Sequence, residues 1–252
     1  MELRDKTIIV TGASSGIGAA AACLFAAEGA SVVLGARREA ELAAVARKIE
    51  QAGGRADFLA GDVRDEDHAA RLVERALHTF GRLDGALNNA GIVGALGPVA
   101  DMPLATFHDV LATNLTSAFL AAKAQIPVLE RAGRGAIVFT SSFVGFSNGG
   151  LPGMGAYAAS KAGLIGLVQS LASDHAARGV RINALLPGGT LTPAGGEHDP
   201  EAQKFIAGLH PMKRMARAEE IAQAALFLLS DRASFVTGSP LLADGGMSVR
   251  LL

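Results

Sequence analysis

The sequence contains one cysteine, almost no net charge and no apolar run long enough to cross a membrane. Cys23 cannot form an internal disulfide, and its apolar neighbours predict a small buried side chain. The net charge of −1 gives no electrostatic basis for binding nucleic acid or an anionic membrane surface. Charged residues after Met1 stand where a signal peptide needs an apolar stretch, so we expect a cytoplasmic protein.

The histidines are also few and scattered. None of the six shows the paired i, i+4 spacing with a carboxylate that is typical of a metal-binding helix. The sequence therefore predicts no metal site, and we expect nearly all of these histidines to be ordinary surface or helix residues.

The distribution of apolar residues predicts the fold. Half of the residues are apolar, and short β-branched runs alternate with longer Ala-rich stretches of helical period. Apolarity is continuous along each short run, which favours parallel strands covered on both faces by helices. No linker, low-complexity tract or repeat interrupts residues 1–252. We expect one doubly wound, Rossmann-like α/β domain with a parallel seven-stranded sheet between two helix layers. The expected strands are 7–10, 31–34, 56–59, 83–88, 136–140, 181–186 and 239–243, and the expected helices are 18–28, 39–51, 67–80, 106–130, 158–178 and 219–229.

The longest irregular stretch, residues 187–214, is rich in Gly and Pro and follows a late strand. Ligands of open α/β sheets bind outside the carboxyl ends of the strands. We therefore expect a substrate-covering segment at about 188–214, since structureless loops of this length are usually functional. A disordered surface insertion is the alternative.

A glycine-rich turn follows the first expected strand, with the sequence Gly12-Ala13-Ser14-Ser15-Gly16-Ile17-Gly18. Its position between a strand and a helix is typical of a phosphate-binding loop, because glycines let the backbone approach a pyrophosphate at a helix N-terminus. Gly12–Gly16 also matches the Gly-x-Ser-x-Gly elbow of α/β hydrolases. That enzyme class needs an oxyanion loop from an earlier strand, and only eleven residues precede Gly12, so we disfavour it.

The residues after the second expected strand indicate which dinucleotide binds. This strand ends Leu34-Gly35-Ala36-Arg37-Arg38, without the carboxylate that usually accepts from the ribose hydroxyls of NAD(H). Guanidinium groups pair well with phosphate. We therefore predict NADP(H), with Ser14 and Arg37 near the 2′-phosphate. A solvated charge pair at the start of a helix is the alternative, and NAD(H) remains possible.

Tyr157 and Lys161 are four residues apart at the start of an expected helix and share one of its faces. An ammonium close to a phenol is expected to lower the pKa of the phenol toward a range that suits acid–base catalysis. Ser141 and Ser142 end the fifth expected strand, at the edge where ligands bind. One of their hydroxyls can then hydrogen-bond a substrate oxygen beside the phenol.

These motifs occur in order with others: Asp62-Val63, Asn88-Asn89-Ala90-Gly91, Asn114, Asn183, Pro187-Gly188 and the final stretch Leu241–Gly246. Together they resemble the short-chain dehydrogenase/reductase family over essentially the full chain. The resemblance implies that Tyr157 is the acid/base and that Lys161 lowers its pKa and holds the nicotinamide ribose. It implies that Ser142 positions the substrate oxygen and that Asn114 anchors a water-linked proton relay. Without the resemblance, Asn114 could be a helix kink or a polar core residue.

The resemblance also implies a cofactor site and an assembly. The expected cofactor-binding residues are Gly12, Ser14, Ser15, Ile17, Gly18, Arg37, Arg38, Asp62, Val63, Asn89, Ala90, Gly91, Tyr157, Lys161, Pro187, Gly188, Thr190 and Thr192. Asp62 would accept from the adenine amine, and Pro187 to Thr192 would meet the nicotinamide end. A homotetramer is implied, with the helices that contain Asn114 and Tyr157 between subunits. Two departures from the family affect the expected pocket shape: a longer loop from Ser142 to Tyr157, and an additional glycine in Pro187-Gly188-Gly189.

We therefore expect an NADP(H)-dependent oxidoreductase that interconverts a carbonyl compound and a secondary alcohol by hydride transfer. The side chains expected to rim the pocket are mostly apolar and favour a neutral ketone, secondary alcohol or acyl chain. They are Phe143, Phe146, Leu151, Met154, Leu191, Phe205, Leu209 and Met212, with Glu197, His198 and Asp199 nearby. The alternatives are an NAD(H)-preferring enzyme of the same family and a regulator that binds the dinucleotide without chemistry. We disfavour the regulator, because a protein that only binds the dinucleotide does not need the acid/base set of Ser142, Tyr157 and Lys161.

Overall fold

The computed structural model describes residues 1–147, 151–193 and 199–249. Its centre is a seven-stranded sheet of order β3-β2-β1-β4-β5-β6-β9 in which all neighbouring strands are parallel. The strands are β1 (Thr7–Thr11), β2 (Ser31–Ala36), β3 (Arg55–Ala60), β4 (Gly85–Asn88), β5 (Gly135–Thr140), β6 (Val180–Pro187) and β9 (Pro240–Ala243). The strand order reverses between β1 and β4, which creates a topological switch point at their carboxyl ends.

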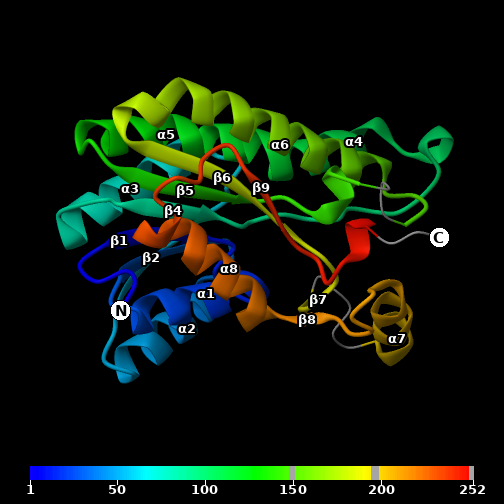
Figure 1. Ribbon diagram of the computed structural model, residues 1–252, viewed down its shortest axis with the longest axis horizontal. Coiled ribbons are helices and arrows are strands. Elements are labelled where there is room, and N and C mark those ends of the chain that lie inside the picture. The colour runs from blue at the N-terminus through cyan, green and yellow to red at the C-terminus, as the bar shows by residue number, and fades with distance from the viewer. Residues whose placement is uncertain (148–150, 194–198, 250–252) are drawn as a thin grey trace.

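Helices cover both faces of this sheet (Figure 1). One layer contains α1 (Gly16–Ala27), α2 (Glu39–Gln51) and α8 (Ala218–Leu229), and the other contains α3 (Glu66–Phe80), α4 (Leu104–Leu111), α5 (Ser117–Arg131) and α6 (Gly155–His175). The seven strands and two helix layers confirm the predicted fold class. Within the described residues, no helix is both long and apolar enough to cross a bilayer.

The continuous apolar runs are explained by a separate core on each face. Side chains of β1 alternate between the faces, so that Ile8 and Val10 pack toward α1 and α8 while Ile9 packs toward α3 and α5. Val32 and Val33 of β2 divide in the same way. Both faces of each central strand are therefore buried, which favours consecutive apolar residues in the middle of the strand.

The expected helix at residues 106–130 is interrupted. Helices α4 and α5 are joined by a π-helical turn over Ala112–Thr116, which adds a residue to one turn and changes the direction in which Asn114 points. Periodicity alone could not separate this turn from the helices on either side.

The described parts of the segment from 187 to 214 contain regular secondary structure that its composition did not predict. Helix α7 (Pro200–Leu209) begins at Asp199, whose carboxylate accepts from the N–H groups of Glu201 and Ala202 at 3.0 Å each. Strand β7 (Thr190–Leu191) pairs in parallel with β8 (Ala216–Arg217). Short 3₁₀ turns occur at Val99–Asp101, Phe143–Gly145, Ala176–Arg178, Asp231–Ala233 and Met247–Val249.

Candidate active site

The glycine turn lies at the carboxyl end of β1, beside the segment that follows β4. Gly12 and Gly16 adopt φ of 67° and 54°, values that strongly favour glycine. A Cβ on Gly18 would lie 2.3 Å from the Gly12 carbonyl oxygen, and one on Gly12 would lie 2.9 Å from the Cα of Ala90. Thr11 Oγ1 accepts from the N–H of Ala90 at 3.3 Å. The turn therefore packs tightly, and side chains larger than glycine do not fit at Gly12 and Gly18.

The first turn of α1 provides a site for an anion. Ser15 is the N-cap residue, but its side chain does not cap the helix. Its hydroxyl instead accepts from Arg38 at 2.9 Å, and the same guanidinium nitrogen donates to Ser14 at 3.0 Å. The helix N-terminus, two hydroxyls and a guanidinium thus meet at one place, an arrangement that fits the phosphates of a dinucleotide.

Arg37 and Arg38 occupy different places. The sequence interpretation put Arg37 next to Ser14, whereas the structure places Arg38 there. Arg37 is exposed and lies within electrostatic reach of Asp62. Asp62 itself forms an ion pair with Arg64 at 2.6 Å. Hydrogen bonds from Arg64, together with its charge and that of Arg37, hold the pKa of the Asp62 carboxyl below its usual range. Sequence reasoning missed Arg64, although its position two residues after Asp62 suits such a pair.

The structure brings Ser142, Tyr157 and Lys161 together at the carboxyl end of β5. Ser142 is buried, and its hydroxyl lies close enough to the Tyr157 phenol to affect the ionisation of that group. Lys161 is 3 % exposed, and its Nζ lies 5.6 Å from the centre of the Tyr157 ring. The ammonium donates to the Thr140 carbonyl oxygen at 2.8 Å. The shared helix face predicted by the i, i+4 spacing is therefore present.

Burial controls the ionisation of both groups. It raises the pKa of the Tyr157 phenol, and the nearby Ser142 hydroxyl offsets only part of this effect. It also lowers the pKa of Lys161 from about 10.5 to about 8. The net shift of the phenol pKa is therefore upward in the protein alone, opposite to the direction expected from the sequence. The reason is that removing the phenolate from water has the larger effect at this site.

Asn114 projects from the π-helical turn and joins the same group. Its Oδ1 accepts from Ile92 N–H at 2.9 Å, and its Nδ2 donates to the Ile92 carbonyl at 2.8 Å and to Ser160 Oγ at 3.0 Å. A Cβ on Gly91 would lie 3.1 Å from Asn114 Oδ1 and 3.3 Å from Lys161 Nζ. Gly91 lets the backbone lie between the side chains of Asn114 and Lys161. The four residues of the expected tetrad therefore belong to one site; they are Asn114, Ser142, Tyr157 and Lys161.

The segment after β6 covers the glycine turn. Thr190 and Thr192 are buried, and a Cβ on Gly16 would lie 3.0 Å from Thr192 Cγ2. Gly188 N–H donates to Ala243 O at 3.1 Å, which fixes the segment to the end of β9. Residues 194–198 of the predicted substrate-covering segment, with Glu197 and His198, lie outside the described residues.

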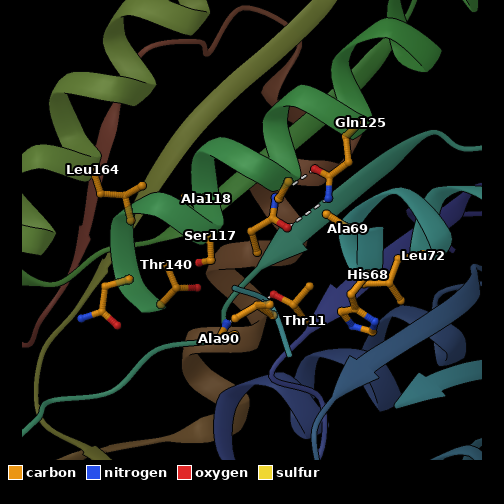
Figure 2. Close-up of a pocket in the computed structure, with 14 residues that line it drawn as sticks. Thr11, His68, Ala69, Leu72, Ala90, Ser117, Ala118, Gln125, Thr140 and Leu164 are labelled. Atoms are coloured by element: carbon orange, nitrogen blue, oxygen red, sulfur yellow. Dashed lines mark hydrogen bonds between the residues drawn. The ribbon is translucent and has the colours of Figure 1, made fainter. Parts of the chain in front are cut away.

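A small polar cavity adjoins this site (Figure 2). Its volume of about 20 Å³ is enough for about one water molecule and far too small for a dinucleotide. Figure 2 shows His68 and Leu72 projecting from α3 into this region, opposite Gln125 of α5. The lining residues include Thr11, Val63, His68, Asn88, Ala90, Asn114, Ser117, Gln125 and Thr140.

Two histidines are buried. His68 and His210 are 0 % and 2 % exposed; His68 lies in α3, as expected of a helix residue, whereas His210 follows α7 and is neither a helix nor a surface residue. Burial lowers the pKa of His68, and neither of its ring nitrogens has a hydrogen-bond partner within the described part of the chain. Across the same residues, no group of three His, Cys, Asp or Glu side chains could hold a metal ion.

The apolar side chains expected to rim the substrate pocket divide into two groups. Phe143 is buried against Val144 and Met247, whereas Phe146, Phe205 and Met212 are more than half exposed. Cys23 is only partly buried and packs against the core. In the longer loop after Ser142, residues 148–150 lie outside the described residues.

Known proteins resemble this chain over nearly its whole length. The family model described as enoyl-(acyl carrier protein) reductase matches residues 12–248. The chain is 42 % identical over 251 residues to 2,5-dichloro-2,5-cyclohexadiene-1,4-diol dehydrogenase of Sphingobium indicum strain B90A, covering 98 % of each chain. It is 41 % identical over 242 residues to cis-4-hydroxycyclohexanecarboxylate dehydrogenase of Sinomonas cyclohexanicum, covering 96 % of each. The crystal structure of levodione reductase superposes with a TM-score of 0.94 at 32 % identity, covering 99 % of this chain and 100 % of that one.

Proposed function

The chain belongs to the short-chain dehydrogenase/reductase family and is an NAD(P)-dependent oxidoreductase of CH–OH and C=O groups; from this premise we propose that it uses NADP(H), with Tyr157 as the acid/base. The observation that carries the proposal is the grouping of Tyr157, Ser142 and Lys161 at the carboxyl end of β5, next to the glycine turn. A neutral phenol at this place can donate a proton to a carbonyl oxygen, and Ser142 can hydrogen-bond the same oxygen.

Each residue of the group has a distinct part in the proposed reaction. The bound nicotinamide cofactor supplies or accepts the hydride. Because its pKa is raised, the phenol of Tyr157 is protonated at neutral pH and ready to act in the reductive direction. The phenolate that remains is stabilised by the nearby Lys161 ammonium. With a pKa of about 8, Lys161 can hold or release a proton near neutral pH, and Asn114 fixes the backbone of Ile92 beside it.

The NADP(H) preference is supported by the charges at the end of β2. Arg38 reaches both Ser14 and Ser15, while exposed Arg37 adds a second positive charge where an NAD(H) enzyme usually has a carboxylate. A 2′-phosphate would add an anionic partner for these guanidinium groups, of which Arg38 otherwise pairs with Glu41 at 3.4 Å.

Replacing Arg38 with alanine should lower kcat/KM for NADPH by about 10- to 100-fold, because a charge-assisted phosphate contact is worth about 1.5–3 kcal/mol. The value for NADH should change little. Initial rates with both cofactors measure this effect. Arg37→Ala is the matched control and should have a smaller effect, since Arg38 is the residue that bonds to Ser14. Equal use of NADH and NADPH by the native protein would contradict the proposed preference.

For the substrate we propose a small ring ketone or a ring secondary alcohol. The support comes from two relatives whose names specify a cyclohexadiene diol and a hydroxycyclohexane carboxylate, and from the apolar side chains near the site. A screen of NADP⁺ reduction with cyclohexanol, cis-4-hydroxycyclohexanecarboxylate and a linear 3-hydroxyacyl thioester tests this class. Turnover of the thioester alone would reject it.

We also propose a homotetramer in the cytoplasm. Helices α5 and α6 would pack between subunits, as in the implied family arrangement, and Phe119 of α5 is half exposed in the single chain. The single cysteine leaves the chain without an internal disulfide, which suits a reducing compartment. Sedimentation equilibrium tests the assembly, and a monomer at micromolar concentration would reject it.

A further inference from the structure

His210 occupies a central position between the substrate-side helix and the cofactor-side segment. It directly follows α7, and its side chain is almost completely buried. Its Nδ1 lies 2.8 Å from the carbonyl oxygen of Ile206, in the last turns of α7. Its Nε2 lies 3.0 Å from the backbone nitrogen of Gly189. One ring therefore connects α7 to the segment that follows β6.

The two backbone partners define the protonation state of the ring. A carbonyl oxygen can only accept, so Nδ1 must carry the proton toward Ile206. The Gly189 N–H can only donate, so Nε2 must be the acceptor. This is one tautomer of the neutral imidazole. The protonated ring has an N–H at both nitrogens, so it would lose the bond to Gly189 and place two donors opposite each other.

Glycines allow the ring to reach this position. A Cβ on Gly188 would lie 2.9 Å from Nε2, one on Gly189 would lie 2.8 Å from Cε1, and one on Gly245 would lie 3.1 Å from Cδ2. The additional glycine of Pro187-Gly188-Gly189 is thereby explained, because any larger residue at 189 would collide with Ile206 and with the imidazole. The carbonyl oxygen of Gly189 in turn accepts from Ala216 of β8 at 2.9 Å.

The charged side chains on the elements around His210 have other partners or meet solvent. They are Asp199, Glu201, Lys204, Lys213, Arg214 and Asp244. The Asp244 carboxylate accepts from the N–H groups of Gly246 and Ser248, at 2.9 and 2.8 Å. Asp199 caps α7, Arg214 pairs with Glu220, and Lys213 Nζ donates to the Gly208 carbonyl. Among the described residues, the ring's hydrogen bonds therefore go to backbone groups.

We propose that His210 is a positioning residue which holds residues 188–192 against α7 and so makes cofactor binding depend on the neutral imidazole. The inference rests on the proposed function, because it requires this segment to contact the nicotinamide end of the cofactor.

The test is calorimetric titration of NADP⁺ into three proteins at pH 8, without substrate. His210→Phe keeps a planar ring but offers no acceptor, and should raise Kd by about 5- to 100-fold, the effect expected when a buried N–H loses its acceptor. His210→Gln offers a carbonyl oxygen to Gly189 and should bind close to the wild-type value. Thermal melting of each protein reports whether it is folded.

Repeating the titration at pH 5.5 separates positioning from simple packing. Wild-type affinity should fall about tenfold more than that of His210→Gln, because a doubly protonated ring cannot accept from the Gly189 N–H, whereas the amide oxygen can accept at either pH. The cofactor phosphates titrate equally in both experiments, so the ratio of the two Kd values isolates the ring. If His210→Phe does not fold, this comparison alone decides.

Two results would overturn this inference and leave the proposed function intact. They are wild-type affinity for NADP⁺ in folded His210→Phe, and the same pH dependence of that affinity in the wild type and His210→Gln. Either would show that the ring only fills space. Failure of the wild-type protein to bind NADP⁺ or NAD⁺ at any pH would instead reject the proposed function, and this inference with it.

Discussion

Tyr157→Phe is expected to lower kcat by about 10²- to 10⁴-fold, the usual contribution of a positioned general acid or base. The substitution removes only the phenol oxygen and leaves a ring that packs against Phe143, Val144 and Met247. Folding and cofactor affinity should therefore change little, because the lost group acts on the substrate oxygen. Ser142 keeps its contact with the Val144 N–H at 3.3 Å.

Initial rates of NADPH oxidation with a ring ketone measure this loss, and titration of NADP⁺ into the variant reports cofactor binding. Thr79→Val is a suitable control, since it deletes a hydroxyl on α3 that donates to Asp57 at 2.7 Å, in a region outside the proposed site. It should keep wild-type turnover. If Tyr157→Phe retained turnover within about tenfold of the wild type, the proton would have to come from another group.

The sequence predicted the sheet well because every residue of the central strands β1, β2 and β4 is buried. A strand such as β1 contributes side chains to both cores, so Ile8 and Ile9 must both be apolar and the run stands out from its surroundings. The glycine turn was equally evident, because Gly18 faces the Gly12 carbonyl at a distance that allows no side chain. Local constraints of this kind restrict the residue type at nearly every position involved.

Features that depend on contacts between distant segments were not predictable. Burial of His210 depends on Gly188 and Gly245, which neighbour it in space but belong to other segments. The choice of Arg38 over Arg37 at Ser14 depends on the directions in which two consecutive side chains leave the end of β2. Strands β7 and β8 have two residues each, too few for any periodicity.

The direction of the Tyr157 pKa shift was mispredicted for a related reason. Sequence spacing places an ammonium near the phenol and indicates a lower pKa, but it carries no information on how much water reaches either group. In the structure Lys161 is buried and Tyr157 is partly buried, and loss of water around the phenol raises its pKa, opposite to the direction expected from a nearby ammonium. Geometry from spacing can therefore be right while the electrostatics derived from it are wrong.

Lys161→Met is expected to lower kcat/KM by about 10²- to 10⁴-fold while making the protein more stable. The pKa of Lys161 is about 8 in the folded protein, below the value of about 10.4 in an unfolded chain. The unfolded state therefore binds the proton more tightly, and stability rises as the pH increases from about 8 to about 10.4. At pH 7 both states are protonated, so the whole cost of burying the ammonium is present.

Methionine has a similar length and no charge, so it removes that cost but leaves the Thr140 carbonyl without its donor. The net gain in the free energy of unfolding at pH 7 should be about 1–3 kcal/mol, and it should shrink by pH 10 as wild-type Lys161 loses its proton. Urea denaturation at both pH values measures this. Lys123→Met, at an exposed lysine paired with Glu66, should change stability by less than about 0.5 kcal/mol. A Lys161→Met protein that is less stable than the wild type at pH 7 would show that the ammonium stabilises the fold. Wild-type turnover by Lys161→Met would exclude Lys161 from the proposed chemistry.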